Sequence, residues 1–238
     1  MKLDILVLAA HPDDAELACG GTLLAHVAMG KKVGIVDFTQ GELGTRGTAE
    51  TRRKEAEKAS QILSLSVREN LGLADAFFEN NAESRLKVIT AIRKYQPDIV
   101  LANAISDRHA DHGKAAKLAT DACFYAGLQK IETFWEGKPQ AAHRPKVVYH
   151  YIQDHYLTPD FVMDITPFWE KKMLAIKAFE TQFYNPDLQE PQTTLSSPDF
   201  LRFLESRARE FGRSIGCNFG EGFTKERYLG VNNLFDLV

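Results

Sequence analysis

The most constraining feature of the sequence is a histidine and two aspartates placed directly after a short apolar run. The run ends at Ala10 and is followed by His11, Pro12, Asp13 and Asp14. A short stretch rich in Leu and β-branched residues predicts a buried strand, and Pro12 would end that strand. In open α/β sheets, ligands bind outside the carboxyl ends of the strands. The polar residues are therefore predicted to lie at a ligand site.

A second cluster of the same type follows a second apolar run. Residues 98–103 are predicted to form a strand, and His109-Ala110-Asp111-His112 comes soon after it. Two His/Asp clusters, each just past a strand, predict one metal centre assembled from two distant segments of the chain. This convergence requires the strand at 98–103 to be a neighbour of the strand before His11.

Strand-like and helix-like segments alternate along the first half of the chain. This order is typical of βαβ units, and it predicts an α/β fold with a mostly parallel sheet and helices on both faces. The predicted strands are 4–10, 33–38, 67–73 and 98–103, and the predicted helices are 14–30, 49–64, 84–95 and about 111–125.

The second half of the chain is less regular. It is predicted to contain strands at 147–152 and 161–165, helices at 167–183 and 199–215, and a long loop at 184–197. Long loops in compact domains are often functional. We expect one domain over residues 1–238, in which residues 1–127 carry the metal site and residues 128–238 complete the substrate pocket.

Composition excludes several classes of protein. The 238 residues carry a net charge of −3, which gives no basic footprint for nucleic acid. No run approaches the ~18 apolar residues of a membrane helix, and the start of the chain lacks the order of a signal peptide. Cys19, Cys123 and Cys217 are widely spaced and form no CxxC pair, which favours reduced thiols and a cytoplasmic location.

The two clusters supply a set of two histidines and one carboxylate, namely His11, Asp14 and His112. Three protein ligands with one open position are what a catalytic zinc requires. The same set also suits non-haem Fe(II). The residues therefore predict Zn²⁺, Fe²⁺ or another divalent metal without choosing among them.

The remaining residues of the clusters favour hydrolysis. Asp13 stands beside a predicted ligand and can take a proton from water, and His109, held by Asp111, can donate to an oxyanion or to a leaving amine. These roles describe the cleavage of an amide or ester, whereas oxygen chemistry would need no such base. A non-haem iron oxygenase stays an alternative. A metal-free nucleotide-binding protein is disfavoured, because the loop after the first strand lacks a GxGxxG turn.

Several motifs resemble those of the LmbE-like or PIG-L-type N-acetylglucosaminyl deacetylases, which are zinc-dependent amidohydrolases on a Rossmann-like sheet. The resemblance runs across nearly the whole chain, and it is strongest to the branch that acts in bacillithiol biosynthesis. The motifs that carry it are AHPDDAE at 10–16, GGT at 20–22, DRHADH at 107–112, GELGTRGT at 41–48, RENLGL at 68–73, FETQF at 179–183 and GEGF at 220–223.

The resemblance implies a role for each matched residue. It implies that His11, Asp14 and His112 are zinc ligands, that Asp13 is the general base, and that His109, oriented by Asp111, stabilises the tetrahedral intermediate. It also implies that Arg52 lies at the substrate mouth. Glu42, Arg46 and Gln182 are weaker candidates, either for substrate contact or for support of the residues that make that contact.

The activity implied by the resemblance is removal of acetyl from an N-acetylglucosaminyl conjugate by a cytoplasmic zinc hydrolase. The predicted substrate is N-acetylglucosaminyl-malate, whose carboxylates would pair with Arg52 or Arg46. Another N-acetyl sugar or a thiol conjugate is the alternative. The resemblance further implies a homo-oligomer, with a hexamer as the expected state.

Overall fold

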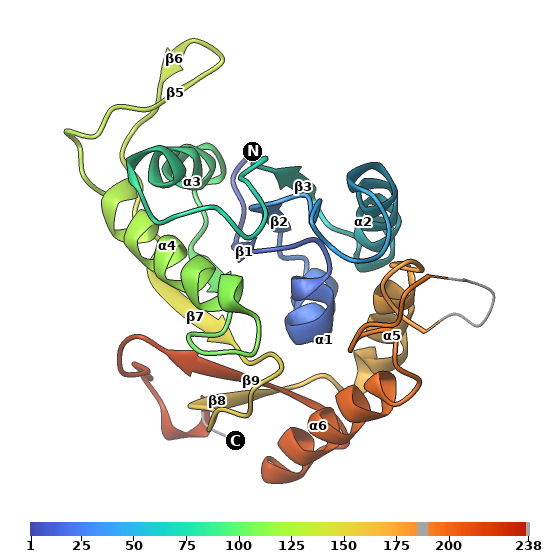
Figure 1. The fold of residues 1–238 in the computed structure, drawn as a ribbon. Helices are drawn as coiled ribbons and strands as arrows, with labels where there is room; N and C mark the ends of the chain where they lie inside the picture. Colours follow the sequence, from blue (N-terminus) through green and yellow to red (C-terminus); the bar gives the residue numbers. More distant parts are fainter. Residues whose placement is uncertain (185–189, 237–238) are drawn as a thin grey trace.

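The computed structural model describes residues 1–184 and 190–236, which form one α/β unit around a central sheet (Figure 1). In the first half, strands and helices alternate as predicted. Its elements are β1 (Ile5–Ala9), α1 (Asp14–Ala28), β2 (Val33–Asp37), α2 (Ala49–Leu63), β3 (Val67–Asn70), α3 (Ala82–Tyr95), β4 (Ile99–Ala102) and α4 (Ala110–Ala126). The α/β fold predicted from the sequence is confirmed.

The second half contributes shorter and more varied elements. They are β5 (Phe134–Trp135), β6 (Lys138–Pro139), β7 (Val147–Tyr151), β8 (Phe161–Asp164), η1 (Thr166–Phe168), α5 (Trp169–Lys177), α6 (Phe200–Ser214), β9 (Gly220–Lys225) and η2 (Leu234–Asp236). No helix in the described ranges is long and apolar enough to cross a membrane.

The main sheet has seven strands in the order β3-β2-β1-β4-β7-β9-β8. β1 lies in parallel between β2 and β4, so the two predicted strands that precede the His clusters are neighbours. Leu8 pairs with Ala102 near the carboxyl ends of these strands. The strand order reverses on either side of β1, which is the arrangement that opens a crevice for a ligand.

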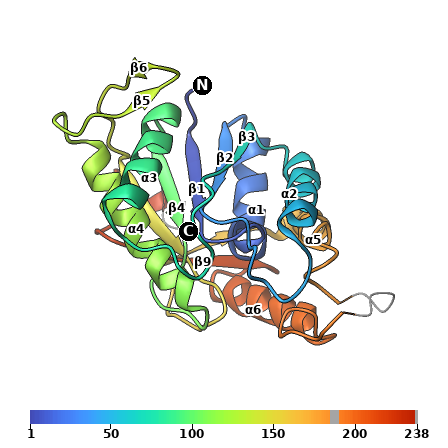
Figure 2. The same cartoon turned by 45° about the horizontal axis from the view of Figure 1, so that its top comes forward.

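Both faces of the sheet are covered by helices, which explains why the central strands β1 and β4 are apolar throughout. Leu6 and Leu8 of β1 pack on the side of α3 and α4, and Ile5 and Val7 pack on the side of α1. Figure 2 shows α3 and α4 on one side of the sheet and α1, α2 and α5 on the other. Alternate residues of a strand point to opposite faces, so a strand buried on both faces needs apolar residues at every position.

Helix α1 packs unusually close to the segment before α5. A Cβ atom on Gly21 would lie 2.7 Å from the Cβ of Ile165, so the residue at position 21 has to be glycine for the helix to approach this segment. The close contact fixes the position of the helix whose first turn carries Asp13 and Asp14.

The C-terminal part departs from the prediction in three places. The predicted helix 167–183 is the short helix η1 followed by α5, because the chain changes to i→i−3 turns at Phe179 and Gln182. Strand β9 was not predicted, and it pairs antiparallel with β7 and β8. The β5–β6 hairpin was also not predicted. The predicted loop 184–197 includes residues 185–189, which lie outside the described residues.

Candidate active site

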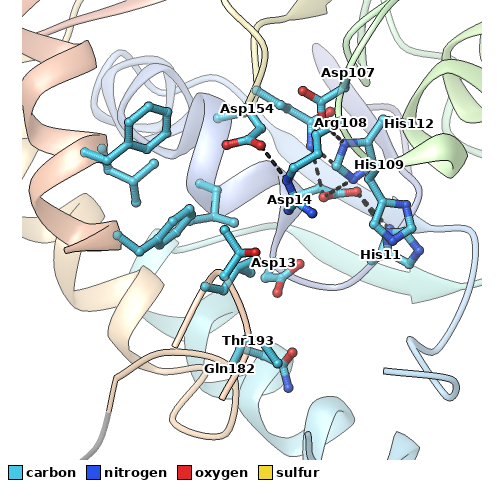
Figure 3. Close-up of a pocket in the computed structure, with 18 of the residues that line it drawn as sticks. His11, Asp13, Asp14, Asp107, Arg108, His109, His112, Asp154, Gln182 and Thr193 are labelled. Atoms are coloured by element: carbon cyan, nitrogen blue, oxygen red, sulfur yellow. Dashed lines mark hydrogen bonds and ion pairs between the residues drawn. The ribbon is translucent and has the colours of Figure 1, made fainter. Parts of the chain in front are cut away.

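The two predicted clusters meet at the carboxyl edge of the sheet. His11 follows β1, Asp14 begins α1, and His109 and His112 lie at the start of α4, which follows β4. They line a cavity of about 390 Å³ (Figure 3). Side chains separated by about a hundred residues in the sequence therefore face one space, because their strands are hydrogen-bonded neighbours.

The spacing of three donor groups fits a single metal ion. His11 Nδ1 lies 3.6 Å from one oxygen of Asp14, and His112 Nε2 lies 3.0 Å from the other. The centroids of the two imidazole rings are 5.7 Å apart. Donors bound to one zinc at ~2.0–2.1 Å in tetrahedral geometry lie roughly 3.3 Å from one another. The residues present thus fit a divalent cation with two nitrogen ligands and one carboxylate ligand.

The far nitrogen of each imidazole has a carboxylate partner. His11 Nε2 lies 3.0 Å from Asp75 and 3.4 Å from Asp111. His112 Nδ1 lies 2.5 Å from Asp107. A carboxylate that accepts the N–H of one ring nitrogen leaves the other nitrogen free to bind a metal. These contacts point His11 Nδ1 and His112 Nε2 toward the cavity.

His11, Asp75 and Asp111 also form a close group that could hold an ion. Two observations favour a supporting role for Asp111. Its oxygen accepts a hydrogen bond from the backbone N–H of Ala76 at 3.0 Å, and its other oxygen lies 3.2 Å from Lys114 Nζ. A carboxylate already engaged by a cation and an amide offers little to a metal.

Asp14 is held in place by two residues that follow the ends of β4 and β7. Asn103 Nδ2 donates to one oxygen at 2.9 Å, and Gln153 Nε2 donates to the other at 3.0 Å. Burial raises the pKa of Asp14, but the charges and hydrogen bonds of His112 and His11 outweigh burial and hold the pKa well below its usual range. Asp14 is therefore a fixed anion at the centre of the cluster.

Burial lowers the pKa of each of the two histidines beside Asp14, but their carboxylate partners outweigh this effect. Hydrogen bonds with Asp111, Asp14 and Asp75 raise the pKa of His11 well above its usual value. The charge of Asp14 and the hydrogen bond with Asp107 raise the pKa of His112 to about 9. The site thus attracts positive charge to the space between these rings, as a cation site must.

Asp13 has an unusual backbone conformation and a buried charge partner. Its φ angle is 115°, a region that side chains other than glycine rarely adopt. Its carboxylate lies 3.1 Å from Arg52 Nη2, and Arg52 also donates to the carbonyl of Pro12. Burial raises the pKa of Asp13 to about 7, although the charge of Arg52 opposes the change. A strained residue beside a cluster of candidate metal ligands indicates a functional constraint.

His109 is the N-cap of α4, and its orientation follows from that position. Its Nδ1 accepts a hydrogen bond at 3.3 Å from the backbone N–H of Asp111. The proton of the neutral ring is therefore on Nε2. Burial lowers the pKa of His109, and the nearby His11 and His112 lower it further. His109 is thus a neutral donor that lines the cavity.

The contacts of Asp111 differ from the expectation that it orients His109 through its carboxylate. The carboxylate contacts His11 and the N–H of Ala76, and only the backbone N–H of Asp111 reaches His109. The reason is the N-cap geometry of α4, which turns the side chain of residue 111 back toward β1. The structure thus links Asp111 to a predicted metal ligand.

The four predicted substrate residues have protein partners in the structure. Arg52 bonds to Asp13, Pro12 and Gln182, and Arg46 pairs with Glu190 and the carbonyl of Phe183. Both arginines line the cavity, as expected, but they are buried and already paired within the protein. Gln182 lines the cavity between them, where it donates to the carbonyl of Arg46.

Glu42 has a structural position outside the cavity lining. Its carboxylate accepts the backbone N–H groups of Gln40 and Asp75. Asp75 in turn accepts the N–H of Leu43, which lines the cavity. These hydrogen bonds attach the Gly-rich loop to Asp75, whose carboxylate contacts His11.

Four residues that position the site were given no role from the sequence, namely Asp75, Asn103, Asp107 and Gln153. A signal was present for three of them. Asn103 directly follows β4, and Gln153 follows the predicted strand 147–152, so both stand at the carboxyl ends of strands like His11. Asp107 belongs to the DRHADH motif. Asp75 had no clear signal, because its contact with His11 depends on how the loop after β3 folds.

Taken together, the fold and the site define an α/β enzyme whose cavity holds His and Asp side chains that fit a divalent cation. The family model described as PIG-L, GlcNAc-PI de-N-acetylase, matches residues 6–123. The chain belongs to this family, which agrees with the resemblance in its motifs.

Solved structures and curated relatives extend the similarity beyond the matched range. The conserved protein TT1542 from Thermus thermophilus superposes with a TM-score of 0.85 at 36% identity, covering 97% of this chain and 98% of that one. The diacetylchitobiose deacetylase of Thermococcus kodakarensis is 26% identical, covering 92% of this chain and 81% of the relative.

Two further relatives differ from each other in activity. A probable N-acetyl-alpha-D-glucosaminyl L-malate deacetylase 2 of Bacillus anthracis is 23% identical, covering 75% of this chain and 81% of the relative. The 4-oxalmesaconate hydratase of Pseudomonas putida is 28% identical, covering 74% of this chain and 73% of the relative. One fold therefore hosts both hydrolysis and hydration among these relatives.

Proposed function

We propose that the protein uses a divalent cation, with zinc as the first candidate, to hydrolyse the N-acetyl group of an N-acetylglucosaminyl conjugate. The observation that carries the proposal is the arrangement around one cavity. One ring nitrogen from each of His11, His109 and His112 lies within 4.8 Å of the others, and of these we assign His11 and His112, together with Asp14, to the cation. Asp13 and His109, which face the same cavity, are assigned to proton transfer. A hydrolase needs this division between groups that bind an ion and groups that move protons.

A divalent cation bound there would polarise the acyl carbonyl and lower the pKa of water. Asp13 is the group that accepts the proton of the attacking water. The ion pair with Arg52 holds its carboxylate in one direction, and the N-cap backbone of α1 fixes the residue beside the ligand Asp14. Asp13 is therefore held in one orientation at the cavity, where it can accept the proton of the attacking water.

His109 donates from Nε2 to the oxyanion that develops on the acyl group. A neutral donor that is already oriented stabilises this charge without rearrangement. The cap contact with the N–H of Asp111 prevents the ring from presenting its other nitrogen. The proton for the leaving amine comes from Asp13 or His109, because both line the cavity.

For the particular substrate, we propose N-acetylglucosaminyl-malate, with another N-acetyl sugar as the competing candidate. The similarity to the Bacillus anthracis malate deacetylase supports the first, and the similarity to the diacetylchitobiose deacetylase supports the second. Arg46 and Arg52 are buried and paired with carboxylates, so the malate group would need Arg108, which lines the cavity with a side chain that is 43% exposed and would have to exchange its present partner, Asp154, for the substrate.

The test is a product assay on enzyme of measured metal content. Purified protein is stripped with a chelator, reloaded with zinc or with iron under anaerobic conditions, and incubated with N-acetylglucosaminyl-malate and with N,N′-diacetylchitobiose. We expect acetate and a free amine in equal amounts, no turnover by the stripped protein, and recovery on reloading. Deacetylation by fully stripped protein would overturn the role of the cation.

Two other results would replace the proposal. Consumption of oxygen by the iron-loaded protein would support the oxygenase. Hydration of an unsaturated tricarboxylic acid such as 4-oxalmesaconate, with neither N-acetyl substrate cleaved, would place the chain functionally with its hydratase relative.

A further inference from the structure

The cavity continues past the reacting groups into an apolar region, which we name the apolar arm. It lies between the first turns of α1, the end of β7 and one face of α6. Its lining consists of Leu17, Ala18, Ile152, Phe203, Leu204 and Phe211. The three histidines lie on the other side of the cavity, where Figure 3 shows them grouped together.

The apolar arm begins one helical turn from the reacting groups. Leu17 and Ala18 follow Asp14 by three and four residues on α1. Residues with this spacing lie on the same face of a helix, one above the other. In an amide substrate, the acyl chain is bonded directly to the reacting carbonyl carbon, whereas the aglycone is separated from it by the nitrogen and the sugar ring. The acyl chain is thus the part of the substrate that reaches this wall first.

The apolar arm presents apolar surface that the protein itself leaves uncovered. Phe203 is 38% exposed, and Leu17 and Leu204 are partly exposed. The guanidinium of Arg207 lies 4.6 Å from the Phe203 ring centroid and covers part of it. Uncovered apolar surface in a cavity favours an apolar ligand, since each Å² removed from water contributes ~25 cal/mol.

The charged pair at the base of the cavity does not oppose an apolar ligand. Lys172 Nζ lies 2.6 Å from Glu221, whose carboxylate also accepts the N–H groups of Gly21 and Thr22. Both charges are therefore satisfied by the protein, and the neighbouring wall is formed by Leu17 and Phe211.

We infer that the apolar arm receives the N-acyl chain of the substrate, so that the enzyme also removes acyl groups longer than acetyl from an aminosugar. Water adds to the acyl carbon and the C–N bond breaks. The products are the longer carboxylate and the protonated amine, as for acetyl. This inference rests on the proposed deacetylase function and adds the class of acyl group that the site accepts.

The first measurement is a chain-length series on zinc-loaded enzyme. Methyl glucosaminides carrying N-acetyl, N-propionyl, N-butyryl and N-hexanoyl groups are compared by kcat/KM through release of the amine. We expect kcat/KM to hold or rise with length, by up to ~4-fold per methylene for complete burial. A fall of tenfold or more from acetyl to butyryl would overturn the inference while leaving the deacetylase function intact.

The second measurement tests whether the side chains of the apolar arm cause the activity on longer acyl groups. Phe203→Gln and Leu204→Gln replace apolar side chains of the apolar arm by a polar one. Ser206→Gln introduces the same Gln side chain on the exposed side of α6. We expect the hexanoyl-to-acetyl ratio of kcat/KM to fall about tenfold in the first two variants and to stay at the wild-type value in Ser206→Gln. Phe203 is exposed enough that its variant should fold.

A ratio that is unchanged in both Phe203→Gln and Leu204→Gln would overturn the inference. If no N-acyl sugar in the series is cleaved by the metal-loaded wild type, including the acetyl compound, the proposed function fails instead. The rate with the acetyl compound thus distinguishes a failure of the acyl-chain inference from a failure of the proposed function.

Discussion

The two halves of the sheet contribute different things to the site. The parallel half, β1 to β4, supplies His11, Asp13, Asp14, His109 and His112. The half that contains the antiparallel strands β8 and β9 supplies walls and the floor of the cavity. The carboxyl ends of parallel strands lie at one edge, so residues after different strands converge there. An antiparallel pair alternates its ends, so it gathers fewer side chains at that edge.

The difference teaches that the reacting groups and much of the apolar arm come from different parts of the chain. The reacting groups lie on backbone fixed by β1 and β4, while Phe203, Leu204 and Phe211 of the apolar arm lie on α6, a helix that packs on β8 and β9. The two parts meet at α1, which carries Leu17 and Ala18 of the apolar arm. Gln153 is the exception, because it comes from the end of β7 and bonds to Asp14. It is thus a direct link from the C-terminal part to a predicted metal ligand.

The largest effect is expected from Asp13→Asn in the parallel half. Loss of a general base lowers kcat by ~10²–10⁴. Asparagine tolerates a positive φ angle and keeps an oxygen for Arg52, so the variant should fold and retain the metal. The measurements are kcat and bound metal per chain. Asp199→Asn on α6 is the surface control, and a kcat within threefold of wild type would show that Asp13 is not the base.

A smaller effect, on stability rather than on turnover, is expected from Lys172→Met in the other half. This change leaves the Glu221 charge buried without its cation, which costs about 3–5 kcal/mol in such pairs. Denaturant unfolding measures the loss. The double variant Lys172→Met/Glu221→Gln removes both charges and should unfold at a higher denaturant concentration than the single variant. A single variant as stable as wild type would mean that the ion pair does not hold β9 to α5.

Gln153→Ala should have the smallest of the three effects, and it tests the link between the halves. Loss of a residue that orients a metal ligand typically lowers metal affinity by 10–100-fold. We expect zinc affinity to fall within this range, with kcat recovered at saturating zinc. Titration against a competing chelator gives the affinity, and Gln140→Ala, at a distant buried amide, serves as control. If Gln153→Ala binds zinc as tightly as wild type, Gln153 does not support the metal site, and the residues that hold the metal all belong to the parallel half.

Much of the parallel half could be predicted because its sequence signals are local. The apolar strands, the break at Pro12 and the two His/Asp clusters are visible in single segments, and the predicted neighbourhood of the two strands is confirmed by the pairing of Leu8 with Ala102. The C-terminal part was harder. The six residues of β9 contain two glycines and two charged residues, so they give no apolar run, although Phe223 and Glu221 are both buried.

Phe179 and Phe183 show why local patterns also mislead. Their i,i+4 spacing continues the apolar face of α5 and predicts a longer helix, but both rings are buried in the cluster with Ala56 and Ala59 of α2. Tertiary packing decides their conformation, and the chain turns to bring Gln182 against Arg52. The predicted cytoplasmic location and homo-oligomer concern properties outside a single chain, and they stay predictions.

The sequence by itself determined the types of reacting group and the edge of the sheet at which they gather, because residue chemistry and strand ends are local properties. Only the tertiary structure decided the partners of these groups. Arg52 pairs with Asp13 and Asp111 contacts His11 because loops after different strands fold over the same edge. Such contacts join residues 39 to 100 positions apart, and no local pattern encodes them.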